Sequence, residues 1–229
     1  MSFDPVRQPI DPFKLLGDTL SQVAPIYGSL LLICSPGILV SVVQQLAPLN
    51  FQPVVSIVYS LTIAPIIGGT AMYFVYRYLK QGTIDLNGAI SKALSRGGQL
   101  ILGTILYSLA VALGFLCLFF PGMYLSVRWG FVTYGIISQD LSAIDGLKYS
   151  SELVKGRWWQ VFGSMLVSIV FLIPLVGIAT VISVVFKSQP VLAGIFGGII
   201  GLIFTPILIV YYVKLYLRLQ ETATLEPQS

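Results

Sequence analysis

One arginine of this chain lies where a charge is costly. Arg128 falls about seven residues beyond Pro121-Gly122, inside an apolar stretch. A cation at the centre of a bilayer costs at least ~2.5 kcal/mol unless it is paired or hydrated. One interpretation is that Arg128 binds a lipid phosphate or another anionic group, because a guanidinium forms paired hydrogen bonds with phosphate. The other is structural: the guanidinium bonds to backbone carbonyls freed by prolines, or extends outward beside Trp129.

The other residue types that usually carry chemistry are scarce. The 229 residues include no histidine, which is the commonest general base and metal ligand. No nucleotide-binding loop, catalytic triad or zinc-ligand spacing occurs, so we predict no catalytic, cofactor-binding or metal-binding residues and no enzyme. A cation-coupled relay at membrane depth is also not expected, because all nine carboxylates fall in termini or polar connections: Asp4, Asp11, Asp18, Asp85, Asp140, Asp145, Glu152, Glu221 and Glu226.

The composition is that of an integral membrane protein. Hydrophobic residues make up 56% of the chain, charged residues only 10%, and the mean hydropathy is +0.89. A soluble domain carries about 25% charged residues. The net charge of +4 comes from Lys and Arg in short connections beside apolar runs, so nucleic acid is not an expected partner.

Runs of about 20 apolar residues predict an all-α fold with six transmembrane helices. We place them at 26–46, 53–79, 99–119, 122–138, 160–186 and 191–217. The fourth is the shortest and contains Arg128, so a re-entrant or tilted element is the alternative there. If all six cross, eleven of the 13 Lys and Arg residues lie on the side of the N-terminus, with only Lys187 opposite and Arg128 inside a span. The positive-inside rule then predicts cytoplasmic N- and C-termini, in the cytoplasmic (inner) membrane or an internal membrane such as a thylakoid.

The segment before each pair of spans is typical of a short amphipathic helix. Asp11, Asp85 and Ser142 are the expected N-caps, and Asp145 completes a capping box with Ser142. The first helix has its apolar residues at helical spacing: Phe13, Leu16, Leu20 and Val23. The chain 1–229 is therefore predicted to be one membrane domain of three parallel repeats, each an amphipathic helix plus a transmembrane hairpin, at about 11–80, 85–140 and 142–219.

Two further groups of residues fit roles in packing and anchoring. Small residues recur four apart in the sixth span, which favours close helix contact within the bundle or, alternatively, a homodimer interface. These glycines are Gly194, Gly197, Gly198 and Gly201. Arg157, Trp158 and Trp159 precede the fifth span, where indole rings prefer the headgroup region, so we expect them to be interfacial anchors.

Two segments resemble one prokaryotic family. They are PGMYLSVRWGF at 121–131 and DLSAIDGLKYSSELVKGRWWQVFG at 140–163. They are similar to the membrane domain attached to some glycerophosphoryl diester phosphodiesterases and to related free-standing membrane proteins of poorly defined function. The resemblance implies a compact membrane bundle, with Arg128 and Gly156-Arg157-Trp158 as family-like positions. It implies no hydrolase activity, because the soluble domain with that family's metal-binding carboxylates has no counterpart here.

Together these patterns predict a non-enzymatic membrane protein that acts as an accessory or assembly component or interacts with lipids. Its expected partners are membrane lipids and a further membrane protein. A transporter or permease for a lipid-like or anionic solute is the alternative, with Arg128 binding the solute near proline-broken helices. The membrane subunit of a phosphodiesterase is a third interpretation.

Overall fold

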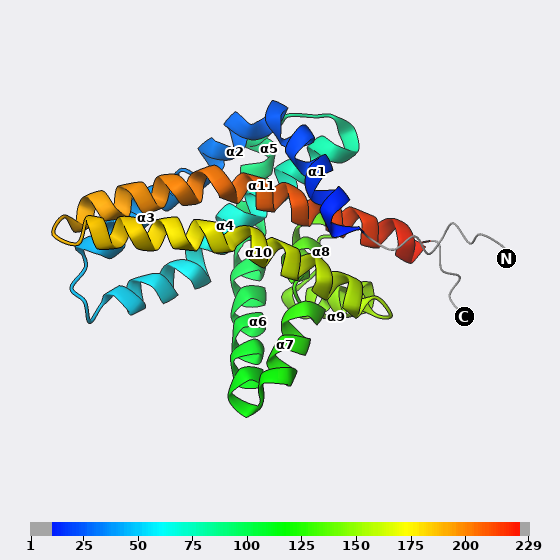
Figure 1. Ribbon diagram of the computed structural model, residues 1–229. Helices are drawn as coiled ribbons and strands as arrows, with labels where there is room; N and C mark the ends of the chain where they lie inside the picture. Colours follow the sequence, from blue (N-terminus) through cyan, green and yellow to red (C-terminus); the bar gives the residue numbers. More distant parts are fainter. Residues whose placement is uncertain (1–10, 225–229) are drawn as a thin grey trace.

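A computed structural model describes residues 11–224, and their regular structure is entirely helical (Figure 1). The elements follow one another in the order α1 (Pro12–Val23), η2 (Ala24–Ile26), α2 (Tyr27–Cys34), α3 (Pro36–Leu46), α4 (Gln52–Gln81), α5 (Leu86–Ser95), α6 (Gly97–Cys117), α7 (Phe119–Arg128), α8 (Val132–Ser138), α9 (Ala143–Val154), α10 (Trp158–Val185) and α11 (Pro190–Thr224). The predicted all-α class is confirmed.

Five helical segments of the described chain are long and apolar enough to cross a membrane. They are Pro12–Leu46, Gln52–Gln81, Gly97–Cys117, Trp158–Val185 and Val191–Ala223. The predicted fourth span, 122–138, differs: it forms the short helices α7 and α8, separated at 129–131. A buried hydroxyl stabilises this break, because Ser150 Oγ accepts from the Phe131 N–H at 3.1 Å and donates to the Arg128 carbonyl at 2.9 Å.

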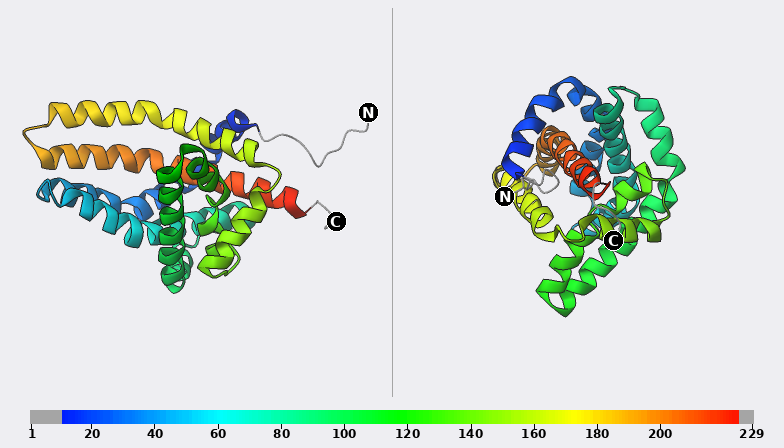
Figure 2. Two further views of the ribbon diagram at one scale, coloured as in Figure 1. Left: turned by 90° about the horizontal axis from the view of Figure 1, so that it is seen from below. Right: turned by 90° about the vertical axis from the view of Figure 1, so that its right-hand side faces the viewer.

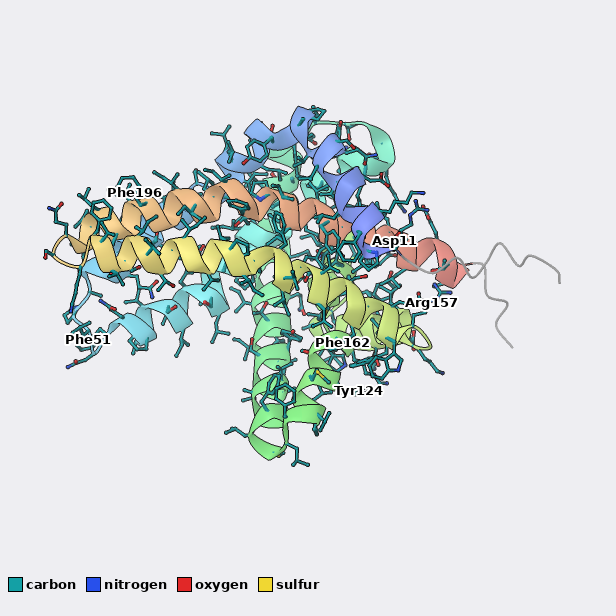
Figure 3. All side chains as sticks on the ribbon, in the orientation of Figure 1. Asp11, Phe51, Tyr124, Arg157, Phe162 and Phe196 are labelled. Carbon is teal, nitrogen blue, oxygen red and sulfur yellow. The ribbon has the colours of Figure 1, made fainter. Side chains whose placement is uncertain are left out.

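The long helices run in one direction, whereas the α6–α7 hairpin projects crosswise from them, as Figures 1 and 2 show. The turns at 47–51 and 186–189 lie at one end of the long helices, with Phe51 and Phe196 beside them, and Arg157 lies toward the other end (Figure 3). The crosswise hairpin does not match three hairpins aligned side by side.

All three expected N-caps are confirmed. The Asp11 carboxylate accepts from the backbone N–H groups of Phe13 and Lys14, and Asp85 accepts from Gly88 at 2.8 Å. That bond, with further help from Arg77, lowers the pKa of Asp85. Ser142 Oγ accepts from the Asp145 N–H at 3.2 Å, but the Asp145 carboxylate accepts from the Ser142 hydroxyl rather than from its backbone.

The amphipathic helices bury faces that the sequence pattern did not specify. On α1 the buried residues are Leu15, Thr19 and Val23, whereas Phe13 is 73% exposed. Of the apolar residues predicted to share one face, Val23 is buried and Leu16 is partly buried, whereas Leu20 is exposed like Phe13. Helical periodicity identifies an apolar face, but in a membrane protein such a face can meet lipid as well as protein.

Each amphipathic helix packs on the helix that ends the preceding hairpin. Helix α5 packs on α4, α9 packs on α8, and α1 closes the cycle by packing on α11. The three closing helices bring tyrosine rings together at the centre, where the Tyr216 ring lies 5.0 Å from that of Tyr134 and 6.3 Å from that of Tyr76. The core of the molecule is thus the meeting point of α4, α8 and α11.

A set of polar bonds surrounds Tyr216, which has no solvent exposure. Its hydroxyl lies 2.8 Å from Ser138 Oγ and 3.0 Å from the Tyr149 hydroxyl. The Gln220 side-chain amide donates to both tyrosine hydroxyls, at 2.7 and 2.9 Å. Because a buried hydroxyl costs free energy unless it is hydrogen-bonded, this set fixes the relative positions of α8, α9 and α11.

The four glycines of α11 divide into two pairs. A Cβ on Gly194 would lie 3.0 Å from the Ser41 carbonyl, and one on Gly198 would lie 2.5 Å from Ser41 Oγ, so both pack closely on α3 of the same chain. A Cβ on Gly197 or Gly201 would meet nothing within 4 Å. The first pair therefore allows close approach within one copy, and the second lines open space between α3, α4 and α11.

Candidate anion-binding site

The candidate site is a cavity of about 310 Å³ where α7 and α9 end and α10 begins. Its lining is formed by Tyr124, Arg128, Ser151, Val154, Lys155, Gly156 and Trp158. Figure 3 shows Tyr124 of α7 near Phe162 of α10, with Arg157 farther along at the α9–α10 connection. Three elements that are separate in sequence thus position the residues of the cavity.

Arg128 is held by hydroxyl groups. Its Nε donates to Ser151 Oγ of α9, and its Nη1 donates to the Tyr124 hydroxyl at 3.0 Å. The guanidinium carbon also lies 5.6 Å from the centre of the Tyr124 ring, which adds a cation–π contact. Within residues 11–224 no carboxylate forms an ion pair with Arg128. The guanidinium is therefore oriented without being neutralised.

Local geometry explains why Arg128 faces the cavity. It is the last residue of α7, immediately before the break at 129–131. The bonds of Ser150 to the backbone on both sides of the break fix where α7 stops, and Ser150 has no solvent exposure. The next residue along α9, Ser151, binds the side chain of Arg128. Two consecutive serines thus hold the backbone and the guanidinium of the same arginine.

Lys155 supplies a second cation. It follows α9 directly and lies one helical turn beyond Ser151, so both residues reach the same cavity. Gly156 then adopts φ +77°, a left-handed conformation that favours glycine, and turns the chain into α10. The part of the chain that the structure describes contains no ion-pair partner for Lys155. The lining consequently carries two positive charges and no negative one.

The predicted interfacial anchors take three different roles. Trp158 stacks on Tyr124 with ring centres 6.0 Å apart and donates from Nε1 to the Tyr124 carbonyl at 3.3 Å, so it forms a wall of the cavity. Trp159 is 76% exposed, as expected of a residue in the headgroup region. Arg157 donates to the Thr222 carbonyl at 3.3 Å and ties the start of α10 to the end of α11.

The structure brings Arg128 and Trp158 together, although the sequence suggested separate roles for them. The glycines 194, 197, 198 and 201 lie elsewhere, on α11. Sequence reasoning missed Tyr124 and Lys155 as members of the site. Tyr124 is one helical turn before Arg128, a spacing that favours contact, whereas nothing in the sequence linked Lys155 to Arg128. Among residues 11–224, no group of three or more Cys, Asp and Glu side chains is placed to hold a metal ion.

No known protein-family model matches this chain, and neither a curated protein nor a solved structure is detectably similar to it. The resemblance to the phosphodiesterase-associated membrane domain stays a prediction.

Proposed function

We propose that this chain is a non-enzymatic membrane protein that interacts with lipids, as an accessory or assembly component, and holds an anionic lipid headgroup at Arg128. The observation that carries the proposal is the cavity beside Arg128, in which a guanidinium and an ammonium face open space with no carboxylate in the lining. The cavity lies at the start of a long apolar helix and next to an exposed tryptophan, which fits the headgroup layer.

Native mass spectrometry of the protein released from nanodiscs tests this function. The nanodiscs contain phosphatidylcholine and phosphatidylglycerol, and the wild type is compared with Arg128→Gln. We expect the wild type to retain phosphatidylglycerol and the variant to lose it. Lys148→Gln is the matched control, because Lys148 is exposed, pairs with Asp145 and lies outside the cavity. Equal retention by Arg128→Gln and the wild type would overturn the proposal.

We further propose six crossings in three repeats, at about 11–80, 85–140 and 142–219. The cyclic packing of α5 on α4, α9 on α8 and α1 on α11 supports three equivalent units. The first two units also end alike, because Gln81 and Gln139 each precede a residue with positive φ, Gly82 at 68° and Asp140 at 58°. In this proposal the α6–α7 hairpin rotates at the helix breaks that flank it, residue 96 and residues 129–131, and then crosses the bilayer alongside the other helices.

The native thiol at the tip of the hairpin tests the six crossings. Cys117 ends α6 and is exposed, whereas Cys34 is partly buried. In a Cys34→Ala background in intact cells, a membrane-impermeant maleimide should label Cys117 from outside if the hairpin crosses and both termini are cytoplasmic. A cysteine introduced at exposed Lys80 serves as the cytoplasmic control. Labelling of Cys117 only after permeabilisation would exclude that topology.

A transporter remains the second candidate because of one cavity within the spans. It measures about 390 Å³ and lies between α3, α4 and α11, which contain Pro36, Pro65 and Pro206. Helices interrupted by proline are typical of solute sites near the midplane. Arg128 is not part of its lining, so a solute there would be bound without the guanidinium. Uptake by proteoliposomes that is unaffected by Arg128→Gln would favour this candidate.

A further inference from the structure

The charge of the candidate site exceeds that of a common phospholipid headgroup. Arg128 and Lys155 contribute two positive charges, and the remaining lining residues are neutral. A phosphodiester, as in phosphatidylglycerol, carries one negative charge. A phosphomonoester carries about −1.5 to −2 at pH 7, because its second pKa is near 6, and it offers three strong acceptor oxygens. Matching of charge therefore favours a phosphomonoester headgroup over a phosphodiester headgroup.

The hydrogen-bond donors of the site also exceed what the protein uses. A guanidinium has five N–H donors and an ammonium has three. Arg128 directs one donor to Ser151 and one to the Tyr124 hydroxyl. Within residues 11–224 no hydrogen bond or ion pair engages Lys155 Nζ, and the residue is exposed at the mouth of the cavity. A terminal phosphate can accept from the free edge of the guanidinium and from the ammonium together.

We infer that the Arg128 cavity selects a lipid phosphomonoester headgroup, with Lys155 as the residue that recognises its second negative charge. This rests on the proposed function, which placed an anionic headgroup at Arg128, and it names the class of that headgroup. Ser151 and Tyr124 orient the guanidinium, and the left-handed turn at Gly156 places Lys155 at the end of α9.

The surroundings favour a lipid over a water-soluble phosphate. The volume of about 310 Å³ is at the low end for small-molecule sites, enough for a headgroup but not for two acyl chains. Farther along α10, between the second and fourth turns beyond Trp158, it presents exposed apolar side chains at Leu166, Ile169 and Val170. Acyl chains of a lipid held at Arg128 would lie against this face of α10.

The experiment compares two anionic lipids in otherwise identical nanodiscs. Phosphatidic acid and phosphatidylglycerol are mixed in equal amounts with phosphatidylcholine, and the lipids retained by the protein are measured by native mass spectrometry at pH 7.5. We expect the wild type to prefer phosphatidic acid by about tenfold, since hydrogen bonds between charged groups are the stronger ones. In Lys155→Gln the preference should fall to about twofold or less while an anionic lipid is still retained.

Two further arms identify the charge and the source of the phosphate. At pH 5 the phosphomonoester loses its second charge, so the wild-type preference should shrink toward that of Lys155→Gln. Glycerol 3-phosphate added at millimolar concentration should not displace the lipid. Displacement by it would show that the site takes a soluble phosphomonoester and would overturn the lipid assignment.

The outcomes separate the two proposals. If anionic lipid is retained in an Arg128-dependent way but without preference for phosphatidic acid, the phosphomonoester inference is wrong and the proposed function stands. If Lys155→Gln keeps the full preference, Lys155 is not the recognising residue and the inference is equally overturned. If neither anionic lipid depends on Arg128, the proposed function itself fails. Lys148→Gln should behave as the wild type in every arm, because it removes a positive charge outside the cavity.

Discussion

The Tyr216 cluster and the Arg128 cavity are both polar groupings in a largely apolar protein, but they differ in how far the protein satisfies them. The Tyr216 hydroxyl has three partners at 2.7–3.0 Å and no solvent exposure. Arg128 has two hydroxyl partners, no carboxylate among the described residues, and an open cavity beside it. A buried hydroxyl that the protein satisfies stabilises one arrangement of helices, whereas a guanidinium with unused donors keeps them available to a ligand.

One helix contributes a residue to each grouping. Helix α9 contributes Tyr149 to the Tyr216 cluster and Ser151 to the Arg128 cavity. Because α9 packs on α8 in the core, the Tyr216 cluster sets the position from which Ser151 orients the guanidinium. Stability and binding should therefore respond differently to substitutions in the two groupings, and this difference can be measured.

The largest expected effect is that of Tyr216→Ala. The substitution removes a large buried side chain and leaves Ser138, Tyr149 and Gln220 without their shared partner. We expect a loss of about 3–5 kcal/mol in the free energy of unfolding, as for other aromatic-to-alanine changes in cores. Unfolding in mixed detergent micelles measures it, with Trp159→Ala at a 76% exposed position as the control. A variant as stable as the wild type would contradict the structural role of the cluster.

Ser150→Ala should affect both properties, since Ser150 holds the α7–α8 break. The buried N–H of Phe131 would lose its acceptor, at a cost of about 1–3 kcal/mol, and the end of α7 would shift together with Arg128. Reduced stability together with reduced lipid retention is the expected result. In the control Ser164→Ala only a bond of 2.9 Å to Gln160 within α10 is removed, so retention should be unchanged. Full lipid retention by Ser150→Ala would show that the break does not position Arg128.

Arg128→Gln should separate binding from stability. Its partners are hydroxyls at the edge of a cavity, and no buried charge is left unpaired when the guanidinium is removed. We expect the free energy of unfolding to change by less than about 1 kcal/mol while lipid retention is lost. The same micelle unfolding assay and native mass spectrometry measure the two effects. A destabilisation as large as that of Tyr216→Ala would instead make Arg128 a structural residue.

The smallest expected effect is that of Asp140→Asn, in a third kind of polar grouping that is exposed and paired. Asp140 lies 2.5 Å from Lys92 Nζ and 2.7 Å from Arg96 Nη2. The Lys92 hydrogen bond lowers the pKa of Asp140. Its contribution of about 0.2–1 kcal/mol is therefore present above the unfolded pKa of about 3.9 and is lost as pH falls through the lower folded pKa. Unfolding of wild type and variant between pH 3 and 7 checks this. A difference in the free energy of unfolding between wild type and variant that grows as pH falls would contradict a stabilising role for ionised Asp140.

The sequence alone determined the class of the protein and several local features. Long apolar runs with few charges require helices in a bilayer, because backbone polar groups must be satisfied within each segment. The N-caps Asp11, Asp85 and Ser142 were also predictable, since a cap involves residues only two or three apart. The sequence alone also singled out Arg128, because it is a charged residue within an apolar stretch.

Only the tertiary structure decided what Arg128 faces and how the hairpins lie. Lys155, Ser151 and Trp158 join Arg128 across more than 20 residues of sequence, through the packing of α9 and α10 against α7. The sequence likewise did not determine the crosswise course of α6–α7 or which face of α1 is buried. The physical reason is shared: in a membrane protein, side chains that face lipid and side chains that face protein are both apolar, so hydrophobic periodicity does not reveal which neighbours a helix has.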